Sequence, residues 1–395
     1  MLNLISEQNF KGKKVVARFD FNVPLKSGKI TDTTRLDLSL PTIKYLLENG
    51  AKKVVLMSHL GRPKGKVNKE LSLEPVAKYL AEALKEEVLL TESATDRGIK
   101  TLLNLPTNKV ILLENLRFHK EETENDPEFS KVLASYGDIY VNDAFGTCHR
   151  AHASTHGIVS HFQHKDVVTG LLIENEIVAL NKVLESPKKP FVGIVGGAKV
   201  SDKIKIVERL LGSVDKLIIG GAMAYPFLKS QGHEVGKSLC SDEDVTLAKS
   251  ILNSKNKDKI VLPVDHLCAE GLDGDTVPST DKNIEQSLMG LDIGSKTINE
   301  YNSILREAKT VLWNGPMGLF ENKKFAEGTL SVAKALASNG DCFTLVGGGD
   351  SVSAVNMSGL SDKVGHISTG GGASLEYIEK GTLPGIQALK HGVTK

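Results

Sequence analysis

The chain has 395 residues, of which 40% are hydrophobic, so it can form two domains or one large α/β domain. Its 49 basic and 48 acidic residues nearly cancel, a balance that does not favour a general binder of nucleic acid or of membrane surfaces. The four cysteines form no C-x-x-C pair, which favours free thiols in a reduced, cytoplasmic setting. No stretch is apolar enough for a membrane span, and the N-terminus lacks the charge order of a signal peptide.

In the first half of the chain, short β-branched runs alternate with amphipathic segments, which predicts βα units around a parallel sheet. The expected strands are residues 14–19, 53–57, 110–113 and 138–141. The expected helices are residues 35–48, 73–84 and 127–135. Ser72 and Asp126 stand where the N-caps of two of these helices belong.

A long apolar segment with helical periodicity, residues 172–184, separates the two halves, and we expect the domain boundary near residues 170–190. The second half repeats the pattern of the first. Its expected strands are residues 191–195, 216–219, 259–262, 310–313 and 342–346, and its expected helices are residues 201–211, 242–252, 295–307 and 323–337. The sequence therefore predicts an α/β protein with two similar Rossmann-like lobes, each a parallel sheet sandwiched by helices, joined by a hinge helix.

The segment VNDAFGTCHRAHASTH, residues 141–156, concentrates potential metal ligands. Cys148, His149, His152 and His156 could bind zinc, but the adjacent Cys148 and His149 cannot both face one metal from a regular helix. Arg150 in their midst would repel a cation. A structural metal site, a loop of ordinary histidines and part of a pocket for an anion all remain open for this segment.

Four arginines follow successive strands of the first half, and they favour the anion pocket. Ligands of open parallel sheets bind beyond the carboxyl ends of the strands. Arg35, Arg62, Arg117 and Arg150 all fall in or just after such loops. Each could be solvated surface, but guanidinium groups bind phosphate and carboxylate through paired hydrogen bonds. The sequence therefore predicts a pocket for a small, multiply charged anion, with His149 and His152 as helpers.

The loops of the second half are rich in glycine instead. They are residues 196–199, 220–222, 314–318, 347–351 and 369–374. Glycines could simply make tight turns, but five such loops favour a nucleotide pocket, where backbone N–H groups approach phosphates closely. The last two loops lead into expected helices, whose N-termini attract anions.

Charged residues within these loops suggest chemistry at phosphates. Asp350 is the one carboxylate of the glycine set and suggests Mg²⁺, which binds few carboxylates together with phosphate oxygens. Lys199 and Lys203, four residues apart at an expected helix start, could face one transferring phosphoryl group or simply form a solvated helix face. The P-loop, protein-kinase and dinucleotide fingerprints are all absent.

Nine ordered motifs carry a resemblance that covers essentially the whole chain. They are RFDFNVP (18–24), SHLGRP (58–63), LLENLRF (112–118), NDAFGTCHRAHAS (142–154), GGAKVSDKI (196–204), MGLDIG (289–294), WNGPMGLFE (313–321), GGGDS (347–351) and STGGGAS (368–374). With these motifs the chain resembles the phosphoglycerate kinase family. The resemblance implies an N-terminal lobe (1–170) that binds phosphoglycerate, an interdomain helix (171–186) and a nucleotide-binding lobe (187–379). It also implies that residues 380–395 pack back on the N-terminal lobe and that the lobes close by a hinge.

The resemblance also assigns site residues. The residues implied for phosphoglycerate are Asp20, Asn22, Arg35, His59, Leu60, Gly61, Arg62, Arg117 and Arg150. Those implied for the nucleotide are Lys203, Gly220, Gly221, Gly290, Leu291, Asn314, Pro316, Glu321, Gly348, Gly349, Asp350 and Ser351, with Asp350 also implied for the metal. The implied catalytic set is Arg35, Lys199, Lys203, Gly371 and Gly372.

The implied reaction is the reversible, Mg²⁺-dependent transfer of a phosphoryl group from 1,3-bisphosphoglycerate to ADP in glycolysis, giving 3-phosphoglycerate and ATP. The resemblance further implies a cytoplasmic monomer that acts on small molecules, with no nucleic-acid or membrane partner. Two other readings are a phosphotransferase for another small acid and a non-catalytic, two-lobed protein that closes on an anion.

Overall fold

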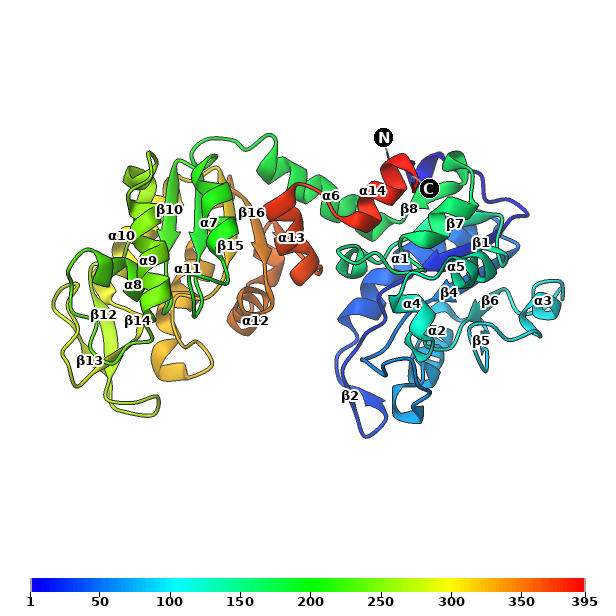
Figure 1. The fold of residues 1–395 in the computed structure, drawn as a ribbon, viewed down its shortest axis with the longest axis horizontal. Helices are drawn as coiled ribbons and strands as arrows, with labels where there is room; N and C mark the ends of the chain where they lie inside the picture. The colour runs from blue at the N-terminus through cyan, green and yellow to red at the C-terminus, as the bar shows by residue number, and fades with distance from the viewer. Residues whose placement is uncertain (1, 394–395) are drawn as a thin grey trace. The chain divides into compact units, whose positions relative to one another are not determined.

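The computed structural model describes residues 2–393, which divide into two compact units. Unit 1 contains residues 2–178 and 382–393, and unit 2 contains residues 179–381. Each unit is built around its own six-stranded parallel sheet with helices on its faces (Figure 1). The predicted α/β fold with two similarly built lobes is therefore confirmed.

The sheet of unit 1 has the strand order β5-β6-β4-β1-β7-β8. Its strands are β1 (Lys14–Arg18), β4 (Lys53–Met57), β5 (Val88–Leu90), β6 (Val110–Leu112), β7 (Ile139–Asn142) and β8 (Val167–Thr169). The helices of this unit are α1 (Thr34–Glu48), α2 (Glu74–Leu84), α3 (Ile99–Leu102), α4 (Lys120–Thr123), α5 (Pro127–Ala134) and α14 (Pro384–His391), and β2 (Leu25–Lys26) pairs with β3 (Lys29–Ile30) in a hairpin. In the central register Arg18 lies beside Met57 on one side and Asn142 on the other. The loops that follow β1, β4 and β7 therefore start from one edge of the sheet.

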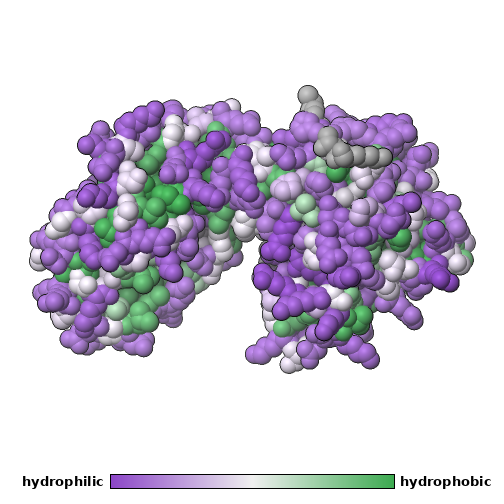
Figure 2. Space-filling model, viewed as in Figure 1, coloured by the Kyte–Doolittle hydropathy of each residue, from purple (hydrophilic) through white to green (hydrophobic). Residues whose placement is uncertain are grey.

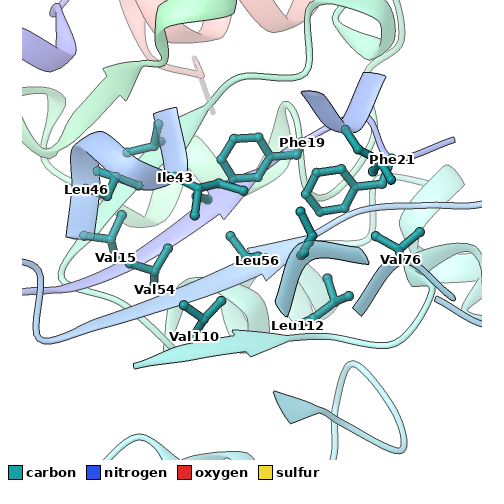
Figure 3. Packing of buried hydrophobic residues seen from close by; sticks show 14 of the residues in the cluster. Val15, Phe19, Phe21, Ile43, Leu46, Val54, Leu56, Val76, Val110 and Leu112 are labelled. Carbon is teal, nitrogen blue, oxygen red and sulfur yellow. The ribbon is translucent and has the colours of Figure 1, made fainter. Parts of the chain in front are cut away.

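Apolar side chains from β1, β4 and β6 pack against α1 and α2 to form the core of unit 1 (Figure 3). At the carboxyl end of β1, the rings of Phe19 and Phe21 stack with centroids 5.4 Å apart. Both rings are fully buried. This packing fixes the path of the backbone on either side of Asp20, which is half-buried between them.

The main sheet of unit 2 has the order β11-β10-β9-β15-β16-β17. Its strands are β9 (Phe191–Val195), β10 (Lys216–Ile219), β11 (Ile260–Val261), β15 (Thr310–Asn314), β16 (Phe343–Gly347) and β17 (His366–Ile367). The helices are α7 (Ile204–Leu211), α8 (Ala224–Ser230), α9 (Asp242–Leu252), α10 (Ser295–Glu307), α11 (Glu327–Ser338), α12 (Gly349–Ser358) and α13 (Gly372–Lys380). A second, antiparallel sheet of order β13-β12-β14 comprises β12 (His266–Ala269), β13 (Val277–Pro278) and β14 (Met289–Ile293). This small sheet was not predicted.

Helix α6 (Leu171–Leu184) begins in unit 1 and ends in unit 2, since the division falls between Val178 and Ala179. Its first turn is held within unit 1, where Asp143 Oδ1 accepts hydrogen bonds from Leu172 N at 2.8 Å and Ile173 N at 3.2 Å. At the other end of the chain, α14 lies beside β8 of unit 1 (red in Figure 1), and Gly385 N donates to Cys148 O at 2.8 Å.

The predicted elements differ from the structure mainly at their ends. Asp126 caps α5 as expected, because its Oδ1 accepts from Phe129 N at 2.8 Å. Ser72 is not the N-cap of α2, which is Leu73. The hydroxyl of Ser72 donates to Glu114 Oε2 at 2.7 Å and accepts from N of Glu74, the first residue of α2, at 3.2 Å. The expected helix 323–337 is divided into a 3₁₀ turn and α11.

No helix within residues 2–393 is long and apolar enough to cross a membrane. The visible surfaces of both units are predominantly hydrophilic, with smaller hydrophobic patches among them (Figure 2).

Candidate functional site

The carboxyl edge of the unit 1 sheet carries the predicted anion residues. Asp20 and Asn22 follow β1, and His59 to Arg62 follow β4. Arg117 follows β6, Arg150 follows β7, and Arg35 lies in the first turn of α1. Parallel pairing of these strands brings their loops to one edge, as the sequence predicted.

Hydrogen bonds across the loops give this edge a defined shape. Asn22 Oδ1 accepts from Gly61 N at 2.8 Å, which ties the loop after β1 to the loop after β4. Asn115 holds the same loop from the other side, because its Nδ2 donates to Leu60 O at 2.8 Å. Arg117 Nη1 donates to Gly61 O at 2.9 Å.

The positive charge at this edge is mostly unmatched by carboxylates. Arg35 pairs with Asp20 at 2.9 Å, with its side chain 39% exposed. Among residues 2–393 no carboxylate forms an ion pair with Arg62, Arg117 or Arg150. Burial, together with the charges of Arg18 and Arg150, lowers the pKa of Arg117 from 12.5 to about 10. Concentrated, unpaired guanidinium groups disfavour one another, so an anion bound between them would relieve this repulsion.

The two buried histidines of this edge add no positive charge. Burial, followed by the charge of Arg18, holds the pKa of His59 well below its ordinary value. His152 is also buried, and burial with the charge of Arg117 lowers its pKa from 6.5 to about 3. Both rings are therefore neutral near pH 7 and can act only as hydrogen-bonding groups.

Cys148 lies inside unit 1 and does not face a potential metal ligand set. Its thiol is fully buried and lies 3.4 Å from Ala144 O, and burial raises its pKa to about 12. Within residues 2–393, no three side chains of His, Cys, Asp or Glu lie close enough together to hold a metal ion.

Unit 2 contains a cavity of about 500 Å³ whose lining is largely apolar. It is lined by Gly197, Ala198, Gly221, Ala222, Tyr225, Lys237, Leu239, Leu272, Met289, Gly290, Leu291, Pro316, Gly318, Leu319, Glu321 and Asp350. Six residues predicted for the nucleotide are among them, namely Gly221, Gly290, Leu291, Pro316, Glu321 and Asp350. The volume and lining fit a nucleoside better than a small anion.

At two positions in this cavity, only glycine fits sterically. A Cβ on Gly290 would lie 2.2 Å from the hydroxyl of Tyr225. A Cβ on Gly221 would lie 2.6 Å from Gly197 N, and Gly221 also has a φ of +66°. Any side chain at either position would force the walls of the cavity apart.

Lys203 stands just before α7, next to this cavity. Its Nζ donates to Asn314 Oδ1 and lies 3.4 Å from Asn314 O. Asn314 is itself held by Gly347, whose carbonyl accepts from its Nδ2 at 2.8 Å. Burial lowers the pKa of Lys203 from 10.5 to about 8, although Asp350 and Asp202 oppose the change. The ammonium is therefore mostly charged at pH 7 and has no carboxylate ion pair within the described residues.

The expected placement of Lys199 and Lys203 on one helix face is wrong. Helix α7 begins only at Ile204, three residues later than predicted. Lys199 is exposed in the preceding loop, and Lys203 occupies the N-cap position. The glycines of this segment and the turn at 201–203 delay the helix, which amphipathic periodicity alone did not show.

The N-termini of α12 and α13 complete the glycine-rich edge of unit 2. Gly348 has a φ of +89° before α12, and Gly371 has a φ of +52° before α13. Gly349, Gly371 and Gly372 have open space where a Cβ would stand. Ser351 Oγ accepts from Gly315 N and so links α12 to the loop after β15. Backbone N–H groups at these helix ends could face a phosphate.

Several lining residues escaped sequence reasoning. They are Tyr225, Lys237, Leu239, Leu272, Met289 and Leu319. Tyr225 lies on α8, and Lys237 and Leu239 lie between α8 and α9. Leu272 and Met289 belong to the segments in and around the antiparallel sheet, and neither α8 nor this sheet was predicted. Leu319 lies within the motif WNGPMGLFE and Met289 within the motif MGLDIG, which were the available signals. Conversely, six residues predicted for the nucleotide are not among those that line the cavity, namely Lys203, Gly220, Asn314, Gly348, Gly349 and Ser351.

An arginine-rich edge on one parallel sheet and a glycine-walled cavity on another define a class of protein, the two-domain α/β phosphotransferases. Comparison with known proteins identifies the member of this class. The family model described as phosphoglycerate kinase matches residues 5–381. The chain therefore belongs to the phosphoglycerate kinase family and is a phosphotransferase with a carboxyl group as acceptor.

Individual relatives agree over nearly the full length. The chain is 51% identical over 393 residues to the phosphoglycerate kinase of Clostridium botulinum strain Hall, covering 98% of each chain. It is 52% identical over 392 residues to that of Clostridium tetani, covering 98% of this chain and 97% of the relative. The solved phosphoglycerate kinase of Coxiella burnetii superposes with a TM-score of 0.90 at 39% identity, covering 99% of this chain and 98% of that one. The Pyrococcus horikoshii enzyme gives 0.83 at 34% identity, covering 98% of each chain.

Proposed function

We propose that unit 1 binds 3-phosphoglycerate or 1,3-bisphosphoglycerate at its arginine-rich edge, and that unit 2 binds ADP or ATP in its glycine-walled cavity. Family membership gives the overall reaction, in which phosphoryl transfer between these two substrates serves glycolysis. This membership decides against another small acid and against a non-catalytic binding role. The observation that carries the assignment to units is the contrast between three unpaired arginines in unit 1 and an apolar cavity in unit 2.

In unit 1, the substrate carries negative charge at both ends and requires several donors. Arg62, Arg117 and Arg150 supply charge without a carboxylate competitor among the described residues. Asp20 orients Arg35 through the 2.9 Å ion pair. Asn22 and His59 supply neutral hydrogen-bonding groups, and Leu60 and Gly61 belong to the loop that Asn22 and Asn115 hold. Together they recognise a phosphorylated carboxylic acid by charge and shape.

In unit 2, the cavity walls around Gly221, Gly290 and Leu291 would take the base, and Glu321 would accept from the ribose hydroxyls. Asn314 orients Lys203 toward the phosphates. Pro316 forms part of one wall of the cavity. The glycine-rich edge of unit 2 is formed by Gly220 and by the loop from Gly348 to Ser351, and its backbone N–H groups would reach the phosphate oxygens. Glycine at these positions allows a base or phosphate to approach the backbone closely.

The chemistry needs no general base. The acceptor is a carboxylate or a nucleotide phosphate oxygen, and both are already ionised near pH 7. As the new phosphorus–oxygen bond forms to the nucleotide, the bond from phosphorus to the acyl oxygen breaks and leaves a carboxylate. We propose that Arg35, Lys199, Lys203 and the backbone N–H groups near Gly371 and Gly372 neutralise the charge on the transferring group. Alignment and charge neutralisation then supply the rate enhancement.

We propose Asp350 as the protein ligand of Mg²⁺. It lies exposed in the first turn of α12 and lines the cavity, so its carboxylate can reach an ion held by a nucleotide. A single carboxylate with no partner cluster within the described residues fits Mg²⁺, which commonly takes one or two carboxylates and completes its shell with phosphate oxygens and water. When bound, the ion would offset phosphate charge.

Three further properties complete the proposal. Because direct transfer requires the two substrates to meet, we propose that the units close about a hinge in or near α6 when both ligands are bound. Closure would keep water away from the acyl phosphate, because water would otherwise hydrolyse this group. We also propose a cytoplasmic monomer with no nucleic-acid or membrane partner, in keeping with the widely spaced cysteines and the near-zero net charge.

Calorimetric titration of each ligand separately tests the assignment to units. We expect Arg62→Ala to weaken binding of 3-phosphoglycerate by about tenfold or more and to leave MgADP unchanged, because one charge-assisted bond is lost. Lys203→Ala should do the reverse. Arg97→Ala and Lys205→Ala, both at exposed positions, serve as matched controls. If Arg62→Ala weakened only the nucleotide, the proposed division of labour would be wrong.

A further inference from the structure

At the end of β1, Arg18 is fully buried and has a specific partner for each of its nitrogens. Its Nε donates to Ser154 Oγ at 2.8 Å, its Nη1 donates to Phe19 O, and its Nη2 lies 3.1 Å from His59 Nδ1. These hydrogen bonds hold the Arg18 guanidinium in one position, and through it they connect His59 of the anion site to the interior of unit 1.

A buried carboxylate on α4 is linked to Arg18 through Ser154. Glu122 is fully buried, and its Oε1 accepts from Ser154 Oγ at 2.6 Å while its Oε2 accepts from Ser154 N at 3.0 Å. A serine hydroxyl has one proton. Since the Arg18 nitrogen can only donate, Ser154 accepts from Arg18 and gives its own proton to Glu122. The three residues thus form a chain of hydrogen bonds with a single direction.

This direction extends to His59. Arginine has no acceptor, so the contact at 3.1 Å requires His59 Nδ1 to be unprotonated. Among the described residues, the carboxylate oxygen near Nδ1 is Asp20 Oδ1 at 3.9 Å, too far for a hydrogen bond. In a neutral imidazole the proton must then be on Nε2. Within residues 2–393 this N–H has no hydrogen-bond partner, so it is free to donate to a ligand.

We propose that Glu122 is a positioning residue for phosphoglycerate binding: through Ser154 and Arg18 it fixes His59 as the Nε2–H tautomer. His59 then presents a neutral donor to a carboxylate or phosphate oxygen. This inference rests on the proposed role of unit 1. Its functional value is a hydrogen bond that adds no further positive charge beside Arg35 and Arg117. A histidine free to exchange tautomers would offer that donor only part of the time.

Substitution of Glu122 by glutamine isolates its role. Glutamine keeps the size of the side chain but removes the negative charge and replaces one acceptor oxygen with an NH₂ donor. Glutamine then offers one acceptor oxygen to the two donors of Ser154, its N–H and its hydroxyl, so one of the two hydrogen bonds is lost. The buried carboxylate charge linked to Arg18 is removed, and the hydrogen bond that selects the His59 tautomer weakens.

The first readout is the tautomer itself, measured by ¹⁵N NMR of histidine-labelled full-length protein between pH 6 and 8. His59→Gln assigns the signal by its disappearance among the 11 histidines. We expect the wild type to show an unprotonated Nδ1 and a protonated Nε2 across this range. A protonated Nδ1, or a charged ring, in the wild-type protein would overturn the inference without recourse to any variant.

The second readout is kinetic, with Glu124→Gln as the matched control because Glu124 is exposed and two residues away. For Glu122→Gln we expect KM for 3-phosphoglycerate to rise about tenfold, KM for MgATP to stay within about twofold, and His59 to show a mixture of tautomers. Ser154→Ala should give the same pattern by removing only the hydroxyl, which keeps the test valid if Glu122→Gln folds poorly. If Ser154→Ala changed neither the tautomer of His59 nor KM, the proposed relay, which runs from Glu122 through Ser154 and Arg18 to His59, would be overturned.

The two levels of the proposal fail in distinguishable ways. If His59 shows the Nε2–H tautomer and loses it in Glu122→Gln, but the wild type does not bind 3-phosphoglycerate, the relay is supported and the role of unit 1 is wrong. If the wild type binds 3-phosphoglycerate and the tautomer does not respond to Glu122→Gln or Ser154→Ala, the relay is wrong and the role of unit 1 stands.

Discussion

Replacement of Lys203 by methionine should make unit 2 more stable while it removes activity. Lys203 is the partly buried ammonium beside the nucleotide cavity, and its hydrogen-bond partners within the described residues are the side chain and carbonyl of Asn314. A functional charge held without a counter-ion costs stability, because burial disfavours the charged form. Methionine has a similar unbranched shape and no charge.

The size of the effect follows from the pKa of Lys203. Burial lowers it from 10.5 to about 8, and the difference (10.5 − 8) of about 2.5 corresponds to roughly 3 kcal/mol at about 1.4 kcal/mol per pKa unit. Methionine also leaves Asn314 Oδ1 without its donor, which costs about 1 kcal/mol. At pH 7 we therefore expect the free energy of unfolding of unit 2 to rise by about 2 kcal/mol. Loss of one charge at the transferring group should lower kcat by about 10²- to 10³-fold.

Urea unfolding followed by tryptophan fluorescence reports the free energy of unfolding of unit 2. The chain has one tryptophan, Trp313, which is fully buried in β15 of unit 2. Lys205→Met, at an exposed position two residues along, is the matched control and should change neither stability nor kcat appreciably.

The pH dependence fixes the sign of the effect. Below pH 8 the ammonium is charged in both states and its full cost is present. As the pH rises from about 8 to 10.5, the folded state loses the proton first and the cost of roughly 3 kcal/mol disappears, so the wild type should overtake Lys203→Met by about 1 kcal/mol, the contribution of the bond to Asn314. A variant that unfolds at lower urea concentration than the wild type at pH 7 would refute this reasoning, since the bond to Asn314 would then outweigh the cost of burial.

Three further outcomes are expected. Arg35→Ala should reduce kcat about 10²- to 10³-fold with an unchanged unfolding curve, and an unaltered kcat, compared with Arg97→Ala as control, would remove Arg35 from the proposed catalytic set. Gly290→Ala should raise KM for the nucleotide at least about tenfold, because the added Cβ would lie 2.2 Å from the buried hydroxyl of Tyr225. Gly271→Ala is the control and should leave KM unchanged, since no atom lies within 4 Å of its Cβ position. Equal KM values for the two variants would contradict the cavity assignment. His266 is buried and neutral, and burial lowers its pKa from 6.5 to about 4, so the free energy of unfolding of unit 2 should fall by about 2 kcal/mol between pH 7 and pH 5. His266→Phe should abolish most of that fall, as measured by tryptophan-monitored unfolding. An equal fall in both proteins would assign the pH dependence to other groups.

Local patterns predicted the main framework well because buried parallel strands have a strong signature. The runs at β4, β9 and β10 are apolar and β-branched, and the predicted limits are those of the structure. Short edge strands were missed: β5 and β17 have three and two residues and owe their existence to a neighbouring strand. The antiparallel sheet around β12 was missed for the same reason, since its pairing is set by tertiary contacts.

The same distinction applies to the sites. Arg62 and Arg117 could be predicted because each lies in the loop that follows a strand, and the edge of a parallel sheet brings such loops together. Tyr225 could not, because nothing in its neighbourhood distinguishes a cavity wall from an ordinary core helix. The link between Glu122 and Arg18 joins residues 104 positions apart (122 − 18) through Ser154, and no sequence spacing reports such a contact.

The most direct test of the central claim is the initial rate of the full-length protein with MgATP and 3-phosphoglycerate, coupled to glyceraldehyde-3-phosphate dehydrogenase and followed by loss of NADH. Lys203→Met and Lys205→Met would be assayed beside the wild type. We predict a rate that requires both substrates, survives in Lys205→Met and falls at least about a hundredfold in Lys203→Met. Turnover that persists in Lys203→Met, or a folded wild type that binds the nucleotide but shows no 3-phosphoglycerate-dependent rate, would contradict the account.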